Sequence, residues 1–446
     1  MRLLSKFKKN PIHKIAIPAT IAGIAEPILS LTDSAMVGNI PGQGLLSLAA
    51  VGIVGSYLSM LIWVIGQSRA ALSAIISQYL GAGKISEIKD LPAQAILINL
   101  GVSIVLVGIS IAFMNPIFTL MNATGTLLEY TESYFSIRIW GFPLTLLTFA
   151  VFGVFRGLQN TYWPMVIALT GTLLNVLLDY VLVYGLPGVI APMYLEGAAF
   201  ASVIAQAIMA IMAFVLLYRK TSFRLRLQGK IHPELKRFAG MSFNLFIRTI
   251  ALNAALIYSV KVATGIGPAY IGAHTIAFNL WLLAAFFIDG YSSAANLMGG
   301  KLLGAQKYNE LWVLLKKTLS YALLVSGFIM FFGWIFYKPI GRLFSNDPQA
   351  LEVFYQIFYI VILFMPLNAM AFVLDGLFKG LGEMKYLRNV LLLSSFIGFI
   401  PFVYVSTHLG YGLSGIWVGF GFWIFLRFAG LFLKFRSKFL PLAQKG

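Results

Sequence analysis

Long apolar runs, separated by short polar segments, recur along almost the whole chain. An α-helix needs roughly 20 predominantly apolar residues to cross a bilayer. We identify about twelve such runs, near residues 14–38, 45–80, 91–114, 133–155, 163–185, 195–218, 239–262, 268–299, 313–336, 352–378, 388–406 and 412–433. The second and eighth runs are too long for one straight span, so we expect them to bend or to pass the membrane surface. The pattern predicts an all-α polytopic membrane protein.

Composition supports a membrane protein and excludes several other classes. Of 446 residues, 59% are hydrophobic and 11% are charged, with a mean hydropathy of +0.85. A soluble domain is about 45–50% apolar and about 25% charged. An ordinary soluble enzyme and a disordered protein are therefore excluded. The chain has no cysteine, which excludes disulfides, thiolate metal sites and a cysteine nucleophile.

The net charge of +18 is distributed by topology and not as a nucleic-acid-binding patch. Basic residues concentrate in alternate connections, and residues 219–237 alone contain seven lysines and arginines. By the positive-inside rule, this alternation predicts that both termini are cytoplasmic. The first apolar run is too long for a cleavable signal peptide. We expect a multi-pass protein of the cell (inner) membrane that does not bind nucleic acid.

The two halves of the chain resemble each other at a constant offset of 223 residues. The anchors are Gly81-Ala82 with Gly304-Ala305, Pro143 with Pro366, and GVFRG at 153–157 with GLFKG at 376–380. Each half holds six runs, so the halves share one orientation and are expected to be related by a pseudo-twofold axis along the membrane normal. We predict an N-terminal six-helix lobe at 1–218, a basic cytoplasmic linker at 219–238, and a C-terminal six-helix lobe with a short tail at 239–446. This is a transporter architecture.

Ionisable residues inside a membrane are costly and are therefore candidates for function. Asp33, in the first run, and Asp179, in the fifth, both fall in the outer half of the bilayer. Asn175 lies one turn before Asp179 on the same helix face, and Ser202 reaches a similar depth in the sixth run. Two carboxylates that share a low-dielectric site favour retention of a proton. Oxygen ligands also suit a hard cation such as Na⁺. A static buried network without a transport role is the alternative.

Two prolines and a glutamate accompany Asp33 in the first run. Pro18 and Pro27 interrupt the helical hydrogen bonding and predict a bend. A bendable helix would couple ion binding at Asp33 to movement, whereas a fixed kink would not. Glu26 lies near the middle of this run and either lines a cavity or pairs with a basic residue.

The second half offers weaker candidates, namely Asp289, Asn296 and Asp375. For Asp375, an ion pair with Lys379 at i+4 is the structural alternative. Basic residues within the apolar runs are expected either to pair with acidic groups or to extend towards the membrane surface; they are Arg69, Arg138, Arg248 and Lys261.

Motifs for nucleotide binding and hydrolysis are absent from the sequence. GAGKIS around Lys84 is not a P-loop, because Gln78 replaces the first glycine and Ile85 follows the lysine. There is no HExxH and no GxSxG. We therefore expect no enzyme activity and no cofactor, with transport energy drawn from an ion gradient.

The sequence resembles the MATE (multidrug and toxic compound extrusion) family, and within it the DinF-type branch. The resemblance covers nearly the whole chain and rests on EPILSLTDSAMVGNI around Asp33, LLNVLLDYVLVYG around Asn175 and Asp179, and EGAAFASVIAQ around Ser202. Pro18 stands where the family has its bending proline. FIDGY around Asp289 and FVLDGLFKG around Asp375 match the DinF-type branch.

The resemblance implies two six-helix lobes around a cleft, with Asp33, Asn175, Asp179 and Ser202 forming a cation or proton site in the first lobe. Ser202 replaces the usual threonine but keeps its hydroxyl. Asn296 stands where that branch often has a glutamate, which argues against a proton role for the second lobe.

We predict a secondary antiporter that exports organic cations in exchange for protons or sodium ions by alternating access. Its partners are the lipid bilayer and a small organic cation, and we expect a monomer. The alternatives are a flippase for lipid-linked saccharides, an exporter of organic anions, and a channel or receptor without coupled exchange. The sequence identifies neither the substrate nor the coupling ion.

Overall fold

The computed structural model describes residues 10–224, 230–345 and 347–445, without the side chains of Glu26 and Lys445. The protein is 87% helical, and no β-strand forms in these ranges beyond a single bridge between Leu186 and Ile190. Within the described ranges, ten helices are long and apolar enough to cross a membrane, or up to twelve if each of two bent pairs is one span. The predicted all-α polytopic class is confirmed.

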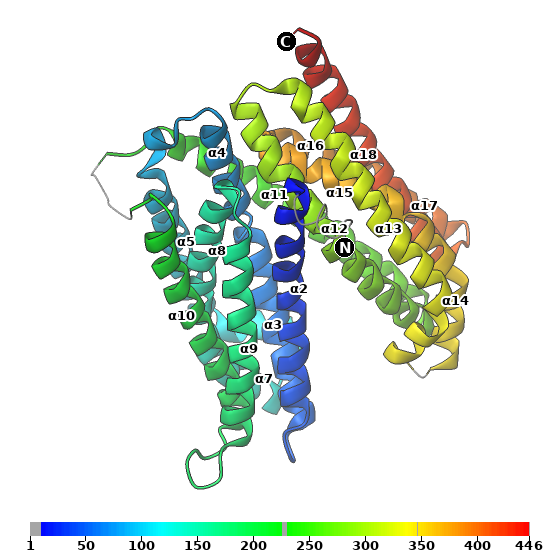
Figure 1. Ribbon diagram of the computed structural model, residues 1–446. Coiled ribbons are helices and arrows are strands. Elements are labelled where there is room, and N and C mark those ends of the chain that lie inside the picture. The colour runs from blue at the N-terminus through cyan, green and yellow to red at the C-terminus, as the bar shows by residue number, and fades with distance from the viewer. Residues whose placement is uncertain (1–9, 225–229, 346, 446) are drawn as a thin grey trace, which may run out of the picture. The chain divides into compact units, whose positions relative to one another are not determined.

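The helices follow the predicted apolar runs closely (Figure 1). In the first half they are α2 (Pro11–Gly38), α3 (Gly44–Ile65), α4 (Ser68–Gly81), α5 (Leu91–Ala112), α6 (Met114–Leu120), α7 (Thr126–Arg138), α8 (Gly141–Gly157), α9 (Tyr162–Tyr184) and α10 (Tyr194–Lys220), with a 3₁₀ turn at Ile85–Ile88. In the second half they are α11 (Glu234–Ile266), α12 (Pro268–Gly304), α13 (Tyr308–Phe344), α14 (Pro348–Leu363), α15 (Met365–Gly380), α16 (Met384–Leu393), α17 (Ile400–His408) and α18 (Gly412–Lys445), with a π-helix at Ser394–Phe399 between α16 and α17.

Two pairs of helices form bent spans at equivalent places in the two halves. The angle is 44° between α7 and α8, and 49° between α14 and α15. Pro143 and Pro366 lie in the first turn of α8 and α15 respectively. Proline is favoured in a first turn because its ring fixes a helical φ and its missing N–H is not needed there. The repeated prolines therefore mark the start of a new helix within each span.

The two over-long runs differ from each other. The run at 45–80 is divided at Gly66 and Gln67 into α3 and α4. The run at 268–299 is one helix, α12, which continues to Gly304 and contains 37 residues. At 1.5 Å per residue, a helix of that length exceeds a bilayer core of roughly 30 Å.

The chain divides into two compact units. One contains residues 1–20, 77–83 and 243–446, and the other contains 21–76 and 84–242. Helix α2 therefore contributes its first part to one unit and its second part to the other. The division into lobes at 219–238 stays a prediction, and residues 225–229 of that segment lie outside the described residues.

The predicted repeat is visible in how helices pack within each unit. At three glycines a Cβ atom would press on the backbone of a neighbouring helix, in the pairs Gly153–Arg69, Gly376–Ser292 and Gly380–Asn296. At Gly157 it would press on the Ile76 side chain and lie 3.1 Å from the Ser73 carbonyl oxygen. Each pair of the second half lies 223 residues after a pair of the first half. The α8–α4 and α15–α12 contacts are thus the same contact made twice, and this explains the GVFRG and GLFKG motifs.

The basic segment after α10 is attached to the start of α5. The Gln94 side chain accepts from the backbone N–H of His232 (2.9 Å) and donates to the carbonyl of Lys230 (2.7 Å). The His232 ring lies 2.9 Å from the carbonyl of Glu87. Residues 230–232 are therefore held by their own unit.

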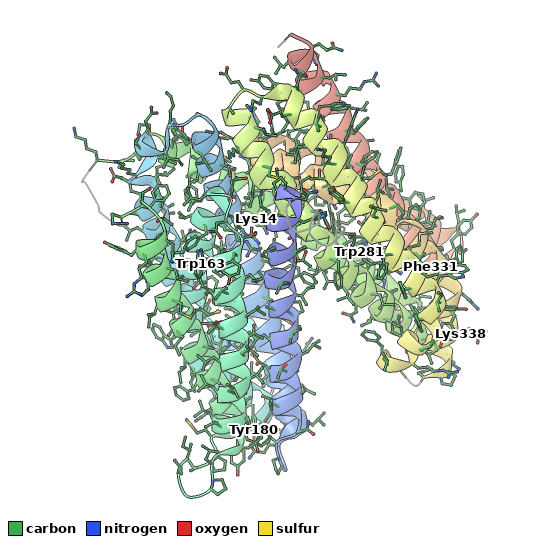
Figure 2. The ribbon with its side chains drawn as sticks, viewed as in Figure 1. Lys14, Trp163, Tyr180, Trp281, Phe331 and Lys338 are labelled. Carbon is green, nitrogen blue, oxygen red and sulfur yellow. The ribbon has the colours of Figure 1, made fainter. Side chains whose placement is uncertain are left out.

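The outer faces of the helices are apolar and aromatic, as expected for contact with lipid. On α13, Phe331 is 62% exposed and Trp334 is 61% exposed. Phe331 and Lys338 mark this helix in Figure 2. Such exposure would be unfavourable in water and fits a hydrocarbon surrounding.

Candidate functional site

Four side chains singled out by the sequence meet inside one unit. Asp33 comes from α2, Asn175 and Asp179 from α9, and Ser202 from α10. All four are buried, with exposed fractions of 8% for Asp33, 2% for Ser202 and 0% for both α9 residues. Asp179 directly precedes Tyr180, which lies towards the end of α9 opposite to Trp163 (Figure 2). The cluster therefore lies near one end of the span.

Local packing brings the helices α9 and α10 close enough for this contact. The two helices run side by side (Figure 1). At Gly197 of α10, a Cβ atom would press on the backbone of Leu182 in α9, so the helices approach there because this residue lacks a side chain. Tyr184, at the end of α9, donates to the carbonyl of Met36 in α2 over 2.7 Å. These contacts fix the three helix ends around the cluster.

Asn175 connects the members of the cluster. Its amide is satisfied at both ends when Nδ2 donates to Asp33 Oδ1 (2.8 Å) and to Asp179 Oδ2 (3.2 Å). Its oxygen then accepts from the backbone N–H of Ser202 (3.2 Å). The Ser202 hydroxyl lies 3.5 Å from Asp33 Oδ2. One amide thus positions both carboxyl groups and the hydroxyl.

The two carboxyl groups are also within hydrogen-bonding reach of each other. Two carboxylates have no hydrogen to share, so this bond requires a proton on one of them. Within the described residues, Asp179 Oδ1 has no hydrogen-bond partner. The arrangement therefore provides a proton position between two acids and one unused oxygen. The same oxygens suit a monovalent cation in place of the proton.

Three further residues surround the cluster, and the sequence did not identify their arrangement. Arg138 of α7 interacts electrostatically with both Asp33 and Asp179. Its Nη1 donates to Gln206 Oε1 (3.0 Å), and it also hydrogen-bonds Tyr134. Sequence reasoning had left Arg138 as either a partner or a surface-directed residue, and the structure makes it a partner. Gln206 had a usable signal, since it lies one turn after Ser202 in α10.

The prolines of α2 leave the helix continuous from Pro11 to Gly38. The division between the two units falls between Thr20 and Ile21, so Pro18 and Pro27 lie on either side of it. Whether they bend the helix during transport stays a prediction. Glu26 lies in this helix, but its side chain is outside the described residues.

The candidates of the other unit do not come together around one site. Asp289 is exposed on α12, and Lys261 is exposed on α11. Asn296 is half-buried, and its Oδ1 has no hydrogen-bond partner among the described residues. In the unit that contains the carboxyl pair, Arg69 lies over the Phe149 ring at 4.4 Å from its centroid. These residues belong to different environments.

Asp375, in contrast, is the centre of a buried ion cluster. It pairs with Lys379 at 3.0 Å, which is the expected i+4 pair, and with Arg248 of α11. Arg427 of α18 lies 3.6 Å from the same carboxylate. The sequence suggested Arg248 only as one of several possible partners and did not identify Arg427, although an arginine within the last apolar run was a usable signal.

A metal site of the usual kind is not found in the described residues. No group of three or more His, Asp or Glu side chains there is placed to hold a metal ion. The candidate cation site has two carboxyl groups, one amide and one hydroxyl. Because Asn175 presents its nitrogen to both carboxyl groups, the oxygens open to a cation come from those carboxyl groups and the hydroxyl.

Comparison with known proteins yields one family and relatives that match most of this chain. The family model MatE matches residues 18–181 and 245–405. Protein DETOXIFICATION 44, chloroplastic, of Arabidopsis thaliana is 27% identical over 429 residues, covering 93% of this chain and 80% of the relative. DNA damage-inducible protein F of Escherichia coli (strain K12) is 24% identical over 402 residues, covering 87% and 84%.

Solved structures show the same fold over nearly the full length. The bent form of the Vibrio cholerae MATE transporter VcmN superimposes with a TM-score of 0.88 at 18% identity, covering 97% of each chain. The sequence motifs and the fold therefore agree along both halves of the chain.

Proposed function

Because this chain belongs to the MatE family of multidrug efflux transporters, we propose that it exports organic cations in exchange for protons or sodium ions. It is a multi-pass membrane protein and not an enzyme, and transporters of this family work without a cofactor on small-molecule substrates. We place it in the cell (inner) membrane with both termini cytoplasmic, on the basis of the alternating basic loops.

The observation that carries the proposal is the carboxyl pair Asp33–Asp179, joined through Asn175. A proton or Na⁺ bound there neutralises a buried negative charge. An organic cation neutralises the same charge. Two cations that compete for one charge, and that favour different conformations, are coupled in opposite directions.

Helix α2 would couple ion binding at Asp33 to the change between the outward-open and inward-open states. This helix carries Asp33 near its end, and its first part packs on α12, where Gly290 lies against the Ala16 carbonyl and the Thr20 hydroxyl. In the outward-open state, ion binding at Asp33 and Asp179 removes their charge, bends α2 at its prolines and releases the substrate. In the inward-open state, loss of the ion restores the charge and a new cation binds.

The acidic character of the cluster favours this function over a lipid-linked saccharide flippase. A flippase moves an anionic headgroup and would need a net positive site. Arg138 offers one positive charge against two carboxyl groups, and it is engaged by Gln206 and Tyr134.

The proposal is tested in proteoliposomes that contain the purified protein. Ethidium, an aromatic cation, is measured while either a proton or a sodium gradient is imposed. We expect one of the two gradients to drive ethidium uphill, and that gradient identifies the coupling ion. If neither gradient moves ethidium, cation export is rejected, and organic anions and lipid-linked saccharides become the next substrates to test.

Removal of the Ser202 hydroxyl is expected to weaken the binding of the coupling ion while the other side chains of the site keep their positions. Ser202→Ala removes one oxygen ligand but keeps the backbone N–H that holds Asn175. We expect the ion concentration for half-maximal transport to rise by about three- to tenfold, because a single hydroxyl contact of this kind contributes roughly 0.5–1.5 kcal/mol and about 1.4 kcal/mol is tenfold.

Ser202→Thr is the matched control, since it keeps the hydroxyl at the same position. It should transport with an ion dependence near that of the wild type. An unchanged ion dependence in Ser202→Ala would exclude this hydroxyl from the ion site.

A further inference from the structure

The buried ion cluster around Asp375 carries more positive than negative charge. The groups that act on Asp375 are Arg248, Lys379 and Arg427. Among the described residues, one carboxylate therefore faces three cations. Exposed fractions are 6% for Asp375, 6% for Arg248 and 3% for Arg427. Uncompensated charge in such surroundings is strongly unfavourable, so this excess of positive charge favours the binding of a further anion.

Arg248 and Arg427 have hydrogen-bond donors that Asp375 does not use. Within the described residues, neither Arg248 Nε nor Arg427 Nη1 has a hydrogen-bond partner. Both atoms belong to side chains that are more than nine-tenths buried. Buried donors are normally paired, and an unpaired one is costly. Guanidinium groups bind carboxylates through two parallel hydrogen bonds, and Asp375 leaves this capacity partly unused.

The repeat shows that the helices do not need these charges in order to pack. Positions 223 residues earlier are equivalent in the other half, and they are Ala25 for Arg248, Phe152 for Asp375, Arg156 for Lys379 and Ile204 for Arg427. The α8–α4 contact forms with a phenylalanine where α15 has Asp375. The cluster was therefore added to a shared scaffold.

The surroundings position Arg427 for a ligand. Its guanidinium lies over the rings of Trp423 (5.1 Å) and Phe372 (5.8 Å). Trp423 Nε1 donates to Ser395 Oγ (3.0 Å), within the π-helix Ser394–Phe399. A π-helical segment inside an α-helix is uncommon and often occurs at functional sites.

We propose that Arg248, Arg427 and Lys379 form a binding site for the carboxylate of a small organic anion, which displaces Asp375 from its ion pairs. A carboxylate is favoured because the cluster already holds one. An anion with two carboxylates would match the excess of charge. The anion would enter the site beside Lys379, because the Lys379 side chain is 17% exposed while the side chains of Asp375, Arg248 and Arg427 are buried.

The test is calorimetric titration of the purified full-length protein in phosphatidylcholine nanodiscs. Succinate is the probe, and succinamide, its neutral diamide, is the matched ligand. The wild type should bind succinate and not succinamide. Arg427→Gln should bind succinate about tenfold more weakly or worse, because it removes a charge-assisted pair. Asp375→Asn should bind succinate more tightly, because the Asp375 carboxylate no longer competes with succinate for the arginines and the lysine.

These opposite shifts separate a ligand site from a structural ion cluster, in which both substitutions would only disturb the fold. If Arg427→Gln does not fold, Lys379→Gln at the exposed edge replaces it and should also weaken succinate. No binding to the wild type and to Asp375→Asn would overturn the proposal. Displacement of succinate by phosphatidylglycerol in the nanodisc, or tighter binding of inorganic phosphate, would overturn the assignment to a carboxylate.

Asp33→Asn keeps this test independent of the proposed transport function. Asp33 and Asp375 belong to different compact units. We expect Asp33→Asn to bind succinate as the wild type does, so loss of cation export and loss of anion binding are distinguishable results.

Discussion

Asp33→Asn is expected to reduce gradient-driven ethidium export to the rate of liposomes without protein. Asparagine has nearly the same shape. Its oxygen can still accept from Asn175 and its amide nitrogen can donate to the Ser202 hydroxyl, so the helices stay assembled. The negative charge of Asp33 is lost, however. Binding of a proton or Na⁺ at this position then no longer neutralises a buried charge and is no longer favoured. The measurement is ethidium export under the gradient that drives the wild type.

Glu310→Gln is the control for changing a carboxylate to an amide. Glu310 is an exposed residue of α13 whose side chain pairs with Lys307. A surface pair of this kind contributes little, so transport should stay near the wild-type rate. Full uphill export by Asp33→Asn would show that the coupling ion binds elsewhere.

Gly380→Ala is expected to lower the stability of the protein strongly. A Cβ atom at Gly380 would collide with the carbonyl oxygen of Asn296, which belongs to the backbone of α12 and cannot turn away. Overpacking of this kind costs about 1–3 kcal/mol or more. We expect the unfolding temperature of the purified protein to fall by about 5 °C or more, measured by the fraction that stays monodisperse after heating.

Gly327→Ala is its matched control within a helix. No atom of the described residues lies within 4 Å of a Cβ atom at Gly327. Alanine is favoured over glycine in a helix interior by roughly 0.5–1 kcal/mol, so this variant should be as stable as the wild type or slightly more stable. Equal unfolding temperatures for the two alanine variants would contradict the close contact of α15 with α12.

The spans were predictable because lipid imposes one rule on every helix that crosses it. Each span must be apolar over a fixed length, and this rule alone located the helices. The length of the run at 45–80 predicted a bend or a passage along the membrane surface, but the position of the break, at Gly66 and Gln67, was not assigned from the sequence. The π-helix Ser394–Phe399 was likewise invisible, because one extra residue in a turn leaves composition unchanged.

The four cation-site residues were predictable because depth along a helix follows from residue number. Asp33 and Asp179 each lie five residues before the end of their helices. Which faces meet is decided by packing, and α7 was not expected at the cluster. Tyr134 and Gln206 were missed for this reason, and the role of Arg138 was left open between a partner and a surface-directed residue.

Reciprocity of exchange tests the central claim most directly. Proteoliposomes are loaded with ethidium, with no ion gradient at the start, and proton movement and ²²Na⁺ uptake are followed as ethidium leaves. Antiport predicts that the outward ethidium gradient drives one of these ions inward against its rising internal concentration, and that Asp33→Asn does not. Loss of ethidium without movement of either ion in the wild type would contradict exchange.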